Sequence, residues 1–135
     1  MTTQVNSMDT DFRPNTFDQV IGQEEIKENL RLKITAFKKT QKSVVHMLFL
    51  GFSGAGKTTL AKVLIKELGI EEYDVLEINS SRENGIDNMR ERINGFVQTM
   101  PFGKFKVVLL DEADYLTQAA QAALRNDMEA YADTV

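Results

Sequence analysis

The chain has 135 residues, 42% of them hydrophobic and 27% charged, which is typical of one compact globular domain. With 16 basic and 20 acidic residues the formal net charge is −4, so any contact with nucleic acid must come from a local basic patch. The absence of Cys and the single His exclude disulfide frameworks, Cys/His zinc sites and Cys nucleophiles. The sequence shows neither a signal peptide nor a membrane-spanning apolar run, so we expect a soluble cytoplasmic protein, or a nuclear one if the source is eukaryotic.

The N-terminal part of the chain divides into a tail and the start of the domain. Residues 1–12 are polar and of mixed charge, and we interpret them as a tail, with the domain spanning residues 13–135. Residues 23–39 carry an apolar residue every three or four positions, which predicts an amphipathic helix. The nearly continuous apolar run from Val44 to Leu50 then predicts a strand buried on both faces, as in parallel sheets.

Helices and strands alternate along the rest of the sequence. We expect helices over about residues 57–68, 86–97 and 117–131, with Thr117 as the N-cap of the last one. Strands are expected over about 73–78 and 105–110. This alternation predicts the α/β class, with a parallel sheet flanked by helices.

The residues from Gly51 to Thr58 fit the phosphate-loop pattern G-x-x-x-x-G-K-[ST], between a predicted strand and a predicted helix. Such glycines let backbone N–H groups turn toward phosphate oxygens, and the helix N-terminus adds partial positive charge. We expect Lys57 to reach the β and γ phosphates and the Thr58 hydroxyl to bind Mg²⁺. The predicted phosphate contacts are Gly51, Ser53, Gly54, Ala55, Gly56, Lys57, Thr58 and Thr59.

Two carboxylates follow the strand predicted at 105–110. Asp111 and Glu112 are expected at the carboxyl edge of the sheet, where ligands of open α/β sheets bind. Asp111 is expected to hold Mg²⁺ through water, and Glu112 to act as the general base that activates a water for attack on the γ-phosphorus. On its own, such a pair could be a helix-capping cluster. Together with the phosphate loop it predicts hydrolysis of a phosphoanhydride.

Asn79 ends the strand predicted before the third helix and should lie near the same edge. Two interpretations of this residue stay open. It could hydrogen-bond Glu112 and hold it unproductive until a ligand arrives, or it could cap the next turn.

Together these motifs resemble the AAA+ ATPase module of sliding-clamp loaders, nearest to the small subunits of replication factor C and their archaeal and phage relatives. Residues 12–14, Phe-Arg-Pro, are similar to the family's Tyr-Arg-Pro strap, and residues 17–23 are similar to its glycine segment, which packs around adenine. Val20 and Ile21 could equally be ordinary core residues. The base contacts that the resemblance implies are Phe12, Arg13, Pro14, Val20 and Ile21.

The resemblance extends to residues 78–90 and to the helix after the carboxylates. In the family, the helix at 86–97 lines the inside of a ring and touches the DNA backbone. Arg82, Asn84 and Arg90 are therefore candidate phosphate contacts, or else solvated residues of a helix face. Asn126 stands where a second Arg is usual, so the coupling between subunits that this Arg carries is in doubt.

The family resemblance also sets expectations for cofactors, partners and topology. It implies ATP and Mg²⁺ as cofactors, and as partners other ring subunits, a sliding clamp and primer-template DNA. The family's five strands are ordered 5-1-4-3-2, and this chain is expected to hold three of them, with Thr134-Val135 at the start of the fourth. We therefore expect the N-terminal part of an ATP hydrolase, active in the intact protein and inactive as these 135 residues alone.

Three other interpretations stay open. A Holliday-junction branch-migration ATPase of the AAA+ class shares the Arg-Pro strap and the Gly-Gln segment. A helicase of the Asp-Glu-Ala-Asp class shares that tetrapeptide, although its other motifs are not visible here. The chain could also be a non-catalytic nucleotide-binding switch or a structural piece.

Overall fold

The computed structural model describes residues 14–20, 22–42, 44–52, 54–82 and 86–135. The expected helices and the strands expected at 73–78 and 105–110 are confirmed to within two residues at each end. The predicted tail lies outside the described residues. The elements are the short 3-10 helix η1 (Phe17–Gln19), α2 (Glu24–Thr40), α3 (Lys57–Glu67), η2 (Glu72–Asp74), β1 (Val75–Asn79), α4 (Ile86–Val97), β2 (Val107–Asp111), η3 (Ala113–Tyr115) and α5 (Gln118–Ala130).

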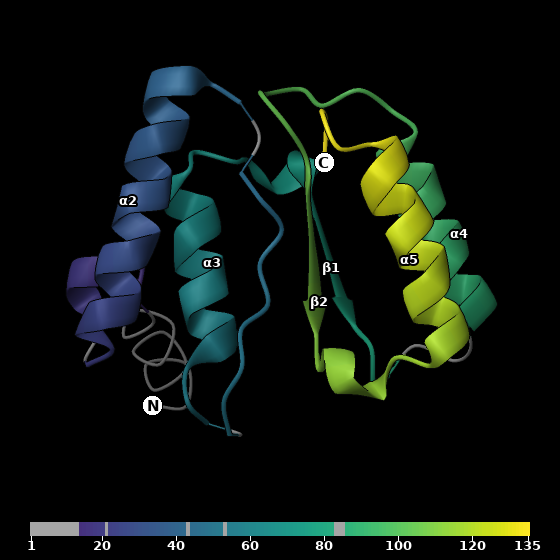
Figure 1. Cartoon of the computed structure of the whole chain (residues 1–135), viewed down its shortest axis with the longest axis horizontal. Helices are drawn as coiled ribbons and strands as arrows, with labels where there is room; N and C mark the ends of the chain where they lie inside the picture. The colour runs from purple at the N-terminus through teal and green to yellow at the C-terminus, as the bar shows by residue number, and fades with distance from the viewer. Residues whose placement is uncertain (1–13, 21, 43, 53, 83–85) are drawn as a thin grey trace, which may run out of the picture.

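Within those ranges, β1 and β2 form a two-stranded parallel sheet. The register pairs Val75 with Val107 at one end and Asn79 with Asp111 at the other. Figure 1 shows the sheet between two layers of helices, with α2 and α3 on one side and α4 and α5 on the other. This is the layered α/β arrangement that the alternation predicts.

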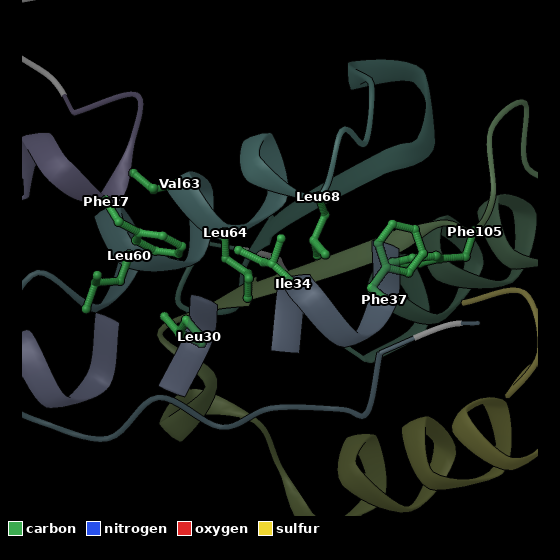
Figure 2. Close-up of a cluster of buried hydrophobic side chains, with 9 residues drawn as sticks. All are labelled: Phe17, Leu30, Ile34, Phe37, Leu60, Val63, Leu64, Leu68 and Phe105. Carbon is green, nitrogen blue, oxygen red and sulfur yellow. The ribbon is translucent and has the colours of Figure 1, made fainter. Parts of the chain in front are cut away.

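Buried apolar side chains of the described residues form one cluster on each side of the sheet. The α4 and α5 side is built around Ile78, which is fully buried, together with Met89, Ile93, Val97 and Ala120. Figure 2 shows the cluster on the other side, which consists of Phe17, Leu30, Ile34, Phe37, Leu60, Val63, Leu64, Leu68 and Phe105. The helical spacing of apolar residues in the sequence therefore becomes the faces that cover the sheet.

The segment from Val44 to Leu50 is not the strand that the sequence predicts. It runs extended past α3 (Figure 1), but it is hydrogen-bonded into no sheet of the described chain, which therefore has two strands rather than the expected three. Val44, Met47 and Phe49 pack against the cluster of Figure 2, whereas Leu48 and Leu50 are 73% and 82% exposed, so partly buried and exposed side chains alternate from residue 47 to residue 50. A strand requires a hydrogen-bonded neighbour, and β2 pairs with β1 alone among the described strands.

Two buried charged side chains fix the loop that leads into β2. The Asp74 carboxylate accepts hydrogen bonds from the backbone N–H groups of Phe102 and Gly103 at 2.9 and 2.7 Å. The Lys106 ammonium donates to the Phe96 carbonyl at 2.6 Å and lies 4.5 Å from the centre of the Phe96 ring. Each buried charge is thus satisfied by hydrogen bonds, and β2 enters the sheet from a fixed position.

Candidate nucleotide-binding site

The glycines of the phosphate loop adopt backbone conformations that other residues rarely reach. Gly54 and Gly56 have φ values of 84° and 87°, and Gly56 is the N-cap of α3. The backbone N–H of Ala55 donates to the Phe52 carbonyl at 3.1 Å, which closes the turn. Since the first N–H groups of any α-helix lack intrahelical acceptors, this turn presents the first amides of α3 at the loop.

Lys57 folds back over the loop that precedes it. Its ammonium donates to the carbonyl of Gly51, and the side chain is half-buried. A Cβ atom at Gly51 would lie 3.4 Å from the Ala55 Cβ and 3.7 Å from the Lys57 Cδ, in ordinary van der Waals contact with both side chains. The lysine therefore places its positive charge against the backbone at the start of the loop.

The side chains of Thr58 and Asp111 join the loop to the end of β2. The Thr58 hydroxyl donates to Asp111 Oδ1 at 3.0 Å, and the same oxygen accepts from the backbone N–H of Glu112 at 3.0 Å. A hydroxyl binds Mg²⁺ through an oxygen lone pair and keeps its proton free to donate to a neighbouring carboxylate. The Thr58–Asp111 hydrogen bond therefore fits the expected arrangement, in which Thr58 binds the ion directly and Asp111 holds it through a water.

The described residues supply few ligands for a Mg²⁺ ion. Across the described ranges, no group of three or more His, Cys, Asp or Glu side chains is arranged to hold a metal ion. A Mg²⁺ ion held by Thr58 and Asp111 would thus take its remaining ligands from phosphate and water, which is usual for Mg²⁺ at phosphate sites.

Glu112 lies directly after β2 in a strained backbone conformation. Its φ and ψ are 54° and 46°, in the left-handed region, which costs a non-glycine residue about 1 kcal/mol. Its carbonyl accepts from the Tyr115 N–H at 3.1 Å, and its side chain is exposed. The tight turn holds the Glu112 carboxylate at the carboxyl edge of the sheet rather than folding it into a helix.

Asn79 lies at the same edge, in register with Asp111. Its side-chain oxygen accepts from the N–H and the hydroxyl of Ser81, at 3.0 and 2.7 Å, so it caps the turn after β1. Both Asn79 and Glu112 belong to the described residues, and no hydrogen bond joins their side chains there. The observed geometry matches the second interpretation, in which Asn79 caps the turn after β1.

Only some of the residues expected to contact the base or DNA belong to the described part of the chain. Val20 is half-buried and packs against the cluster of Figure 2, the core alternative for this residue. Pro14 is half-buried, while Arg82, in the turn after β1, and Arg90, on α4, are exposed. Phe12, Arg13, Ile21, Ser53 and Asn84 lie outside the described residues.

Two contacts at the start of α2 were not predicted from the sequence. The side-chain amide of Gln23 donates to the Ala55 carbonyl in the phosphate loop at 3.2 Å. The Lys27 side chain is buried, and its ammonium donates to the Val20 carbonyl at 2.7 Å and pairs with the Glu24 carboxylate at 2.7 Å. The hydrogen bond from Lys27 lowers the pKa of Glu24. The sequence signal for the first contact is a polar residue, Gln23, directly before a helix. This signal does not indicate which distant residue it contacts.

Comparisons with known proteins show which family the chain resembles. A family model described as the Holliday junction DNA helicase RuvB P-loop domain matches residues 12–135. The chain is 47% identical over 125 residues to replication factor C small subunit 2 of Pyrobaculum aerophilum, and 44% identical over 126 residues to the replication factor C small subunit of Methanococcus vannielii. Each alignment covers 90% of this chain and 38% of the relative.

Solved structures agree on the fold. The Thermotoga maritima RuvB Holliday junction branch migration motor matches with a TM-score of 0.73 and 27% identity, over 89% of this chain and 37% of that one. The P-loop fold and the resemblance to the AAA+ module of clamp-loader small subunits are therefore confirmed. The chain spans less than two fifths of the length of these relatives.

Among the described residues, the helices are too short or too polar to span a membrane.

Proposed function

The chain belongs to the family described as the Holliday junction DNA helicase RuvB P-loop domain, and from this AAA+ membership we propose that it binds and hydrolyses ATP as part of a sliding-clamp loader. The observation that carries the proposal is the 3.0 Å hydrogen bond between Thr58 and Asp111, because it joins the phosphate loop to the carboxylate edge. Relatives that are 44% to 48% identical are named replication factor C small subunits. The partners we propose are further ring subunits, a sliding clamp and primer-template DNA.

The phosphate loop supplies the binding groups. The backbone amides from Gly54 to Thr59 donate to phosphate oxygens, and Lys57 exchanges the Gly51 carbonyl for oxygens of the β and γ phosphates. Thr58 would bind Mg²⁺ through its hydroxyl oxygen, and Asp111, which accepts the Thr58 hydrogen bond, would hold the ion through a water. When bound, Mg²⁺ neutralises charge that develops on the terminal phosphates.

Glu112 supplies the base. Its exposed carboxylate takes a proton from the water that attacks the γ-phosphorus, a role worth typically ~10²–10⁴-fold in rate. Asn79 caps the turn beside it and keeps the end of β1 level with Asp111, so that it positions this edge. A contact from Asn79 to Glu112 would require Asn79 to release Ser81.

The remaining contacts follow from the family resemblance. The strap at residues 12–14 and the segment with Val20 and Ile21 contact adenine, Val20 with the part of the residue that the core leaves exposed. Arg82, Asn84 and Arg90 contact DNA phosphates, and Arg82 and Arg90 are exposed as this requires.

The proposal is tested by separating binding from turnover. Glu112→Gln keeps the shape of the side chain but removes the base, so ATP binding should stay within about twofold while turnover falls at least ~10²-fold. Turnover is measured with the chain alone and after full-length partner subunits are added. Asp114→Asn, an exposed carboxylate in the same turn, is the matched control and should retain turnover. Equal loss of ATP binding and turnover in Glu112→Gln would contradict the role of Glu112.

A branch-migration motor is the second candidate. The family model and the TM-score of 0.73 to the RuvB motor favour it, whereas the higher sequence identity favours the clamp loader. The two differ in the DNA that stimulates turnover of the assembled protein. A clamp with primer-template DNA should stimulate the loader, and a four-way junction should stimulate the motor.

A further inference from the structure

The first turn of α2 contacts both ends of the proposed nucleotide site. Gln23 is the N-cap residue of α2, with φ 58° and ψ 38°, and this left-handed conformation directs its amide to the Ala55 carbonyl, 3.2 Å away. The two residues are 32 positions apart in the sequence. The start of α2 is therefore hydrogen-bonded to the phosphate loop.

The opposite contact is made one turn later on the same helix. Lys27 is 3% exposed, and its ammonium donates to the Val20 carbonyl at 2.7 Å. Glu24 pairs with this ammonium at 2.7 Å, which fixes the position of the lysine. The segment that carries the proposed base contacts is thereby tied to the helix that also holds the phosphate loop.

Fixing two subsites relative to each other affects a ligand that occupies both. A nucleotide that joins base and phosphates gains affinity when their subsites are already at the right separation, because less ordering is needed on binding. Inorganic tripolyphosphate fills only the phosphate subsite and cannot use this arrangement. A residue that links the subsites should therefore strengthen ATP binding more than tripolyphosphate binding.

We propose that Gln23 is a positioning residue that couples the base subsite to the phosphate loop, so that the chain prefers a complete nucleotide to a bare chain of phosphates. This inference rests on the proposed ATP site and names a determinant of its specificity. Gln23 acts through the Ala55 carbonyl, and Lys27 supplies the anchor on the other side.

The test compares two ligands and five proteins. A fluorescent ATP analogue bound to the 135-residue chain with Mg²⁺ is displaced by ATP or by inorganic tripolyphosphate. The proteins are wild type, Gln23→Ala, Gln23→Met, Gln98→Ala and Lys57→Ala. Methionine has about the length of glutamine and no charge that would repel phosphates, but it has no group that can donate to a carbonyl. Gln98 is exposed and follows α4, so its variant controls for the loss of a surface glutamine.

The expected result is selective for ATP. Both Gln23 variants should bind ATP roughly 3- to 10-fold more weakly, the size of one net hydrogen bond, and tripolyphosphate within about twofold of wild type. Gln98→Ala should match wild type with both ligands. A melting temperature without ligand shows that each variant is folded, and Gln23→Met keeps the test valid if Gln23→Ala does not fold.

Three results would overturn the inference or its premise. Unchanged ATP affinity in both Gln23 variants would remove the coupling, and equal weakening of ATP and tripolyphosphate would make Gln23 a mere support of the loop. In both of these cases, loss of binding in Lys57→Ala would leave the proposed function standing. If wild type and Lys57→Ala bind ATP equally, or if neither binds it, the chain has no ATP site of the proposed kind. The inference then fails together with the proposed function.

Discussion

The phosphate loop and the Asp111-Glu112 pair meet in one site, but they follow chain segments of different kinds. Asp111 ends a strand that is paired in register with β1 and covered by α4 and α5. The loop follows an extended segment, residues 44–50, that is unpaired among the described strands and exposes Leu48 and Leu50. Asp111 is therefore held by the backbone pairing of the sheet, and Glu112 follows it directly.

The loop depends instead on side chains and on the start of α3. Lys57 donates to Gly51, Gln23 donates to Ala55, and Thr58 reaches across to Asp111. One half of the site is therefore held by the backbone pairing of the sheet, and the other half by contacts of single side chains. Substitutions in the two halves should consequently differ in kind as well as in size.

The largest expected effect contrasts a buried residue of the paired strand with an exposed residue of the unpaired segment. Ile78→Ala leaves a cavity at a fully buried position and should lower the free energy of unfolding by about 2–5 kcal/mol. Leu50→Ala, at an 82% exposed position, should change it by less than about 0.5 kcal/mol. Urea denaturation of both variants measures this, and similar losses would contradict the contrast.

The next effect concerns the hydrogen bond that joins the halves. Thr58→Val keeps the shape but removes the hydroxyl, so Mg-ATP affinity should fall about tenfold, and chelation of Mg²⁺ by EDTA should weaken ATP binding less than in wild type. Thr35→Val removes a hydroxyl that donates to the Arg31 carbonyl on α2 and is the matched control. An EDTA effect as large in Thr58→Val as in wild type would mean that Thr58 is not a ligand.

These effects also show where the sequence was a sufficient guide. The helices and the strands β1 and β2 could be predicted because apolar spacing depends on local chain geometry. The unpaired segment could not, because an apolar run is the same whether or not a neighbouring strand accepts its hydrogen bonds. Likewise, Lys57, Thr58 and Asp111 belong to local motifs, whereas the Gln23 contact joins residues 32 positions apart.

A smaller effect compares backbone strain in the two halves. Glu112 and Gln41, the C-cap of α2, have φ values of 54° and 58°, which glycine adopts without cost. Each Gly variant should raise the free energy of unfolding by about 0.5–1 kcal/mol. Glu112→Gly should also abolish turnover, while Gln41→Gly should leave ATP binding unchanged. Thermal denaturation with an ATPase assay separates these outcomes, and destabilisation by both variants would refute the strain.

The smallest expected effect is a pH dependence in the loop half. The hydrogen bond and positive charge of Lys27 lower the pKa of Glu24 from 4.5. A carboxyl whose pKa is lower in the folded protein stabilises it above the unfolded pKa and loses this contribution as pH falls through the folded pKa. Glu24→Gln should therefore flatten the loss of melting temperature below about pH 4.5. Identical melting profiles from pH 3 to 7 would contradict this.

The central claim is that the phosphate loop of this chain binds Mg-ATP, and an equilibrium titration tests it most directly. A fluorescent ATP analogue is added to the wild-type chain, to Lys57→Ala and to Lys62→Ala, whose lysine on the same helix pairs with Glu77. We predict saturable binding that ATP displaces, retained in Lys62→Ala and weakened at least ~100-fold in Lys57→Ala. Folded wild-type and Lys57→Ala chains that bind the analogue equally, or fail to bind it, would contradict the account.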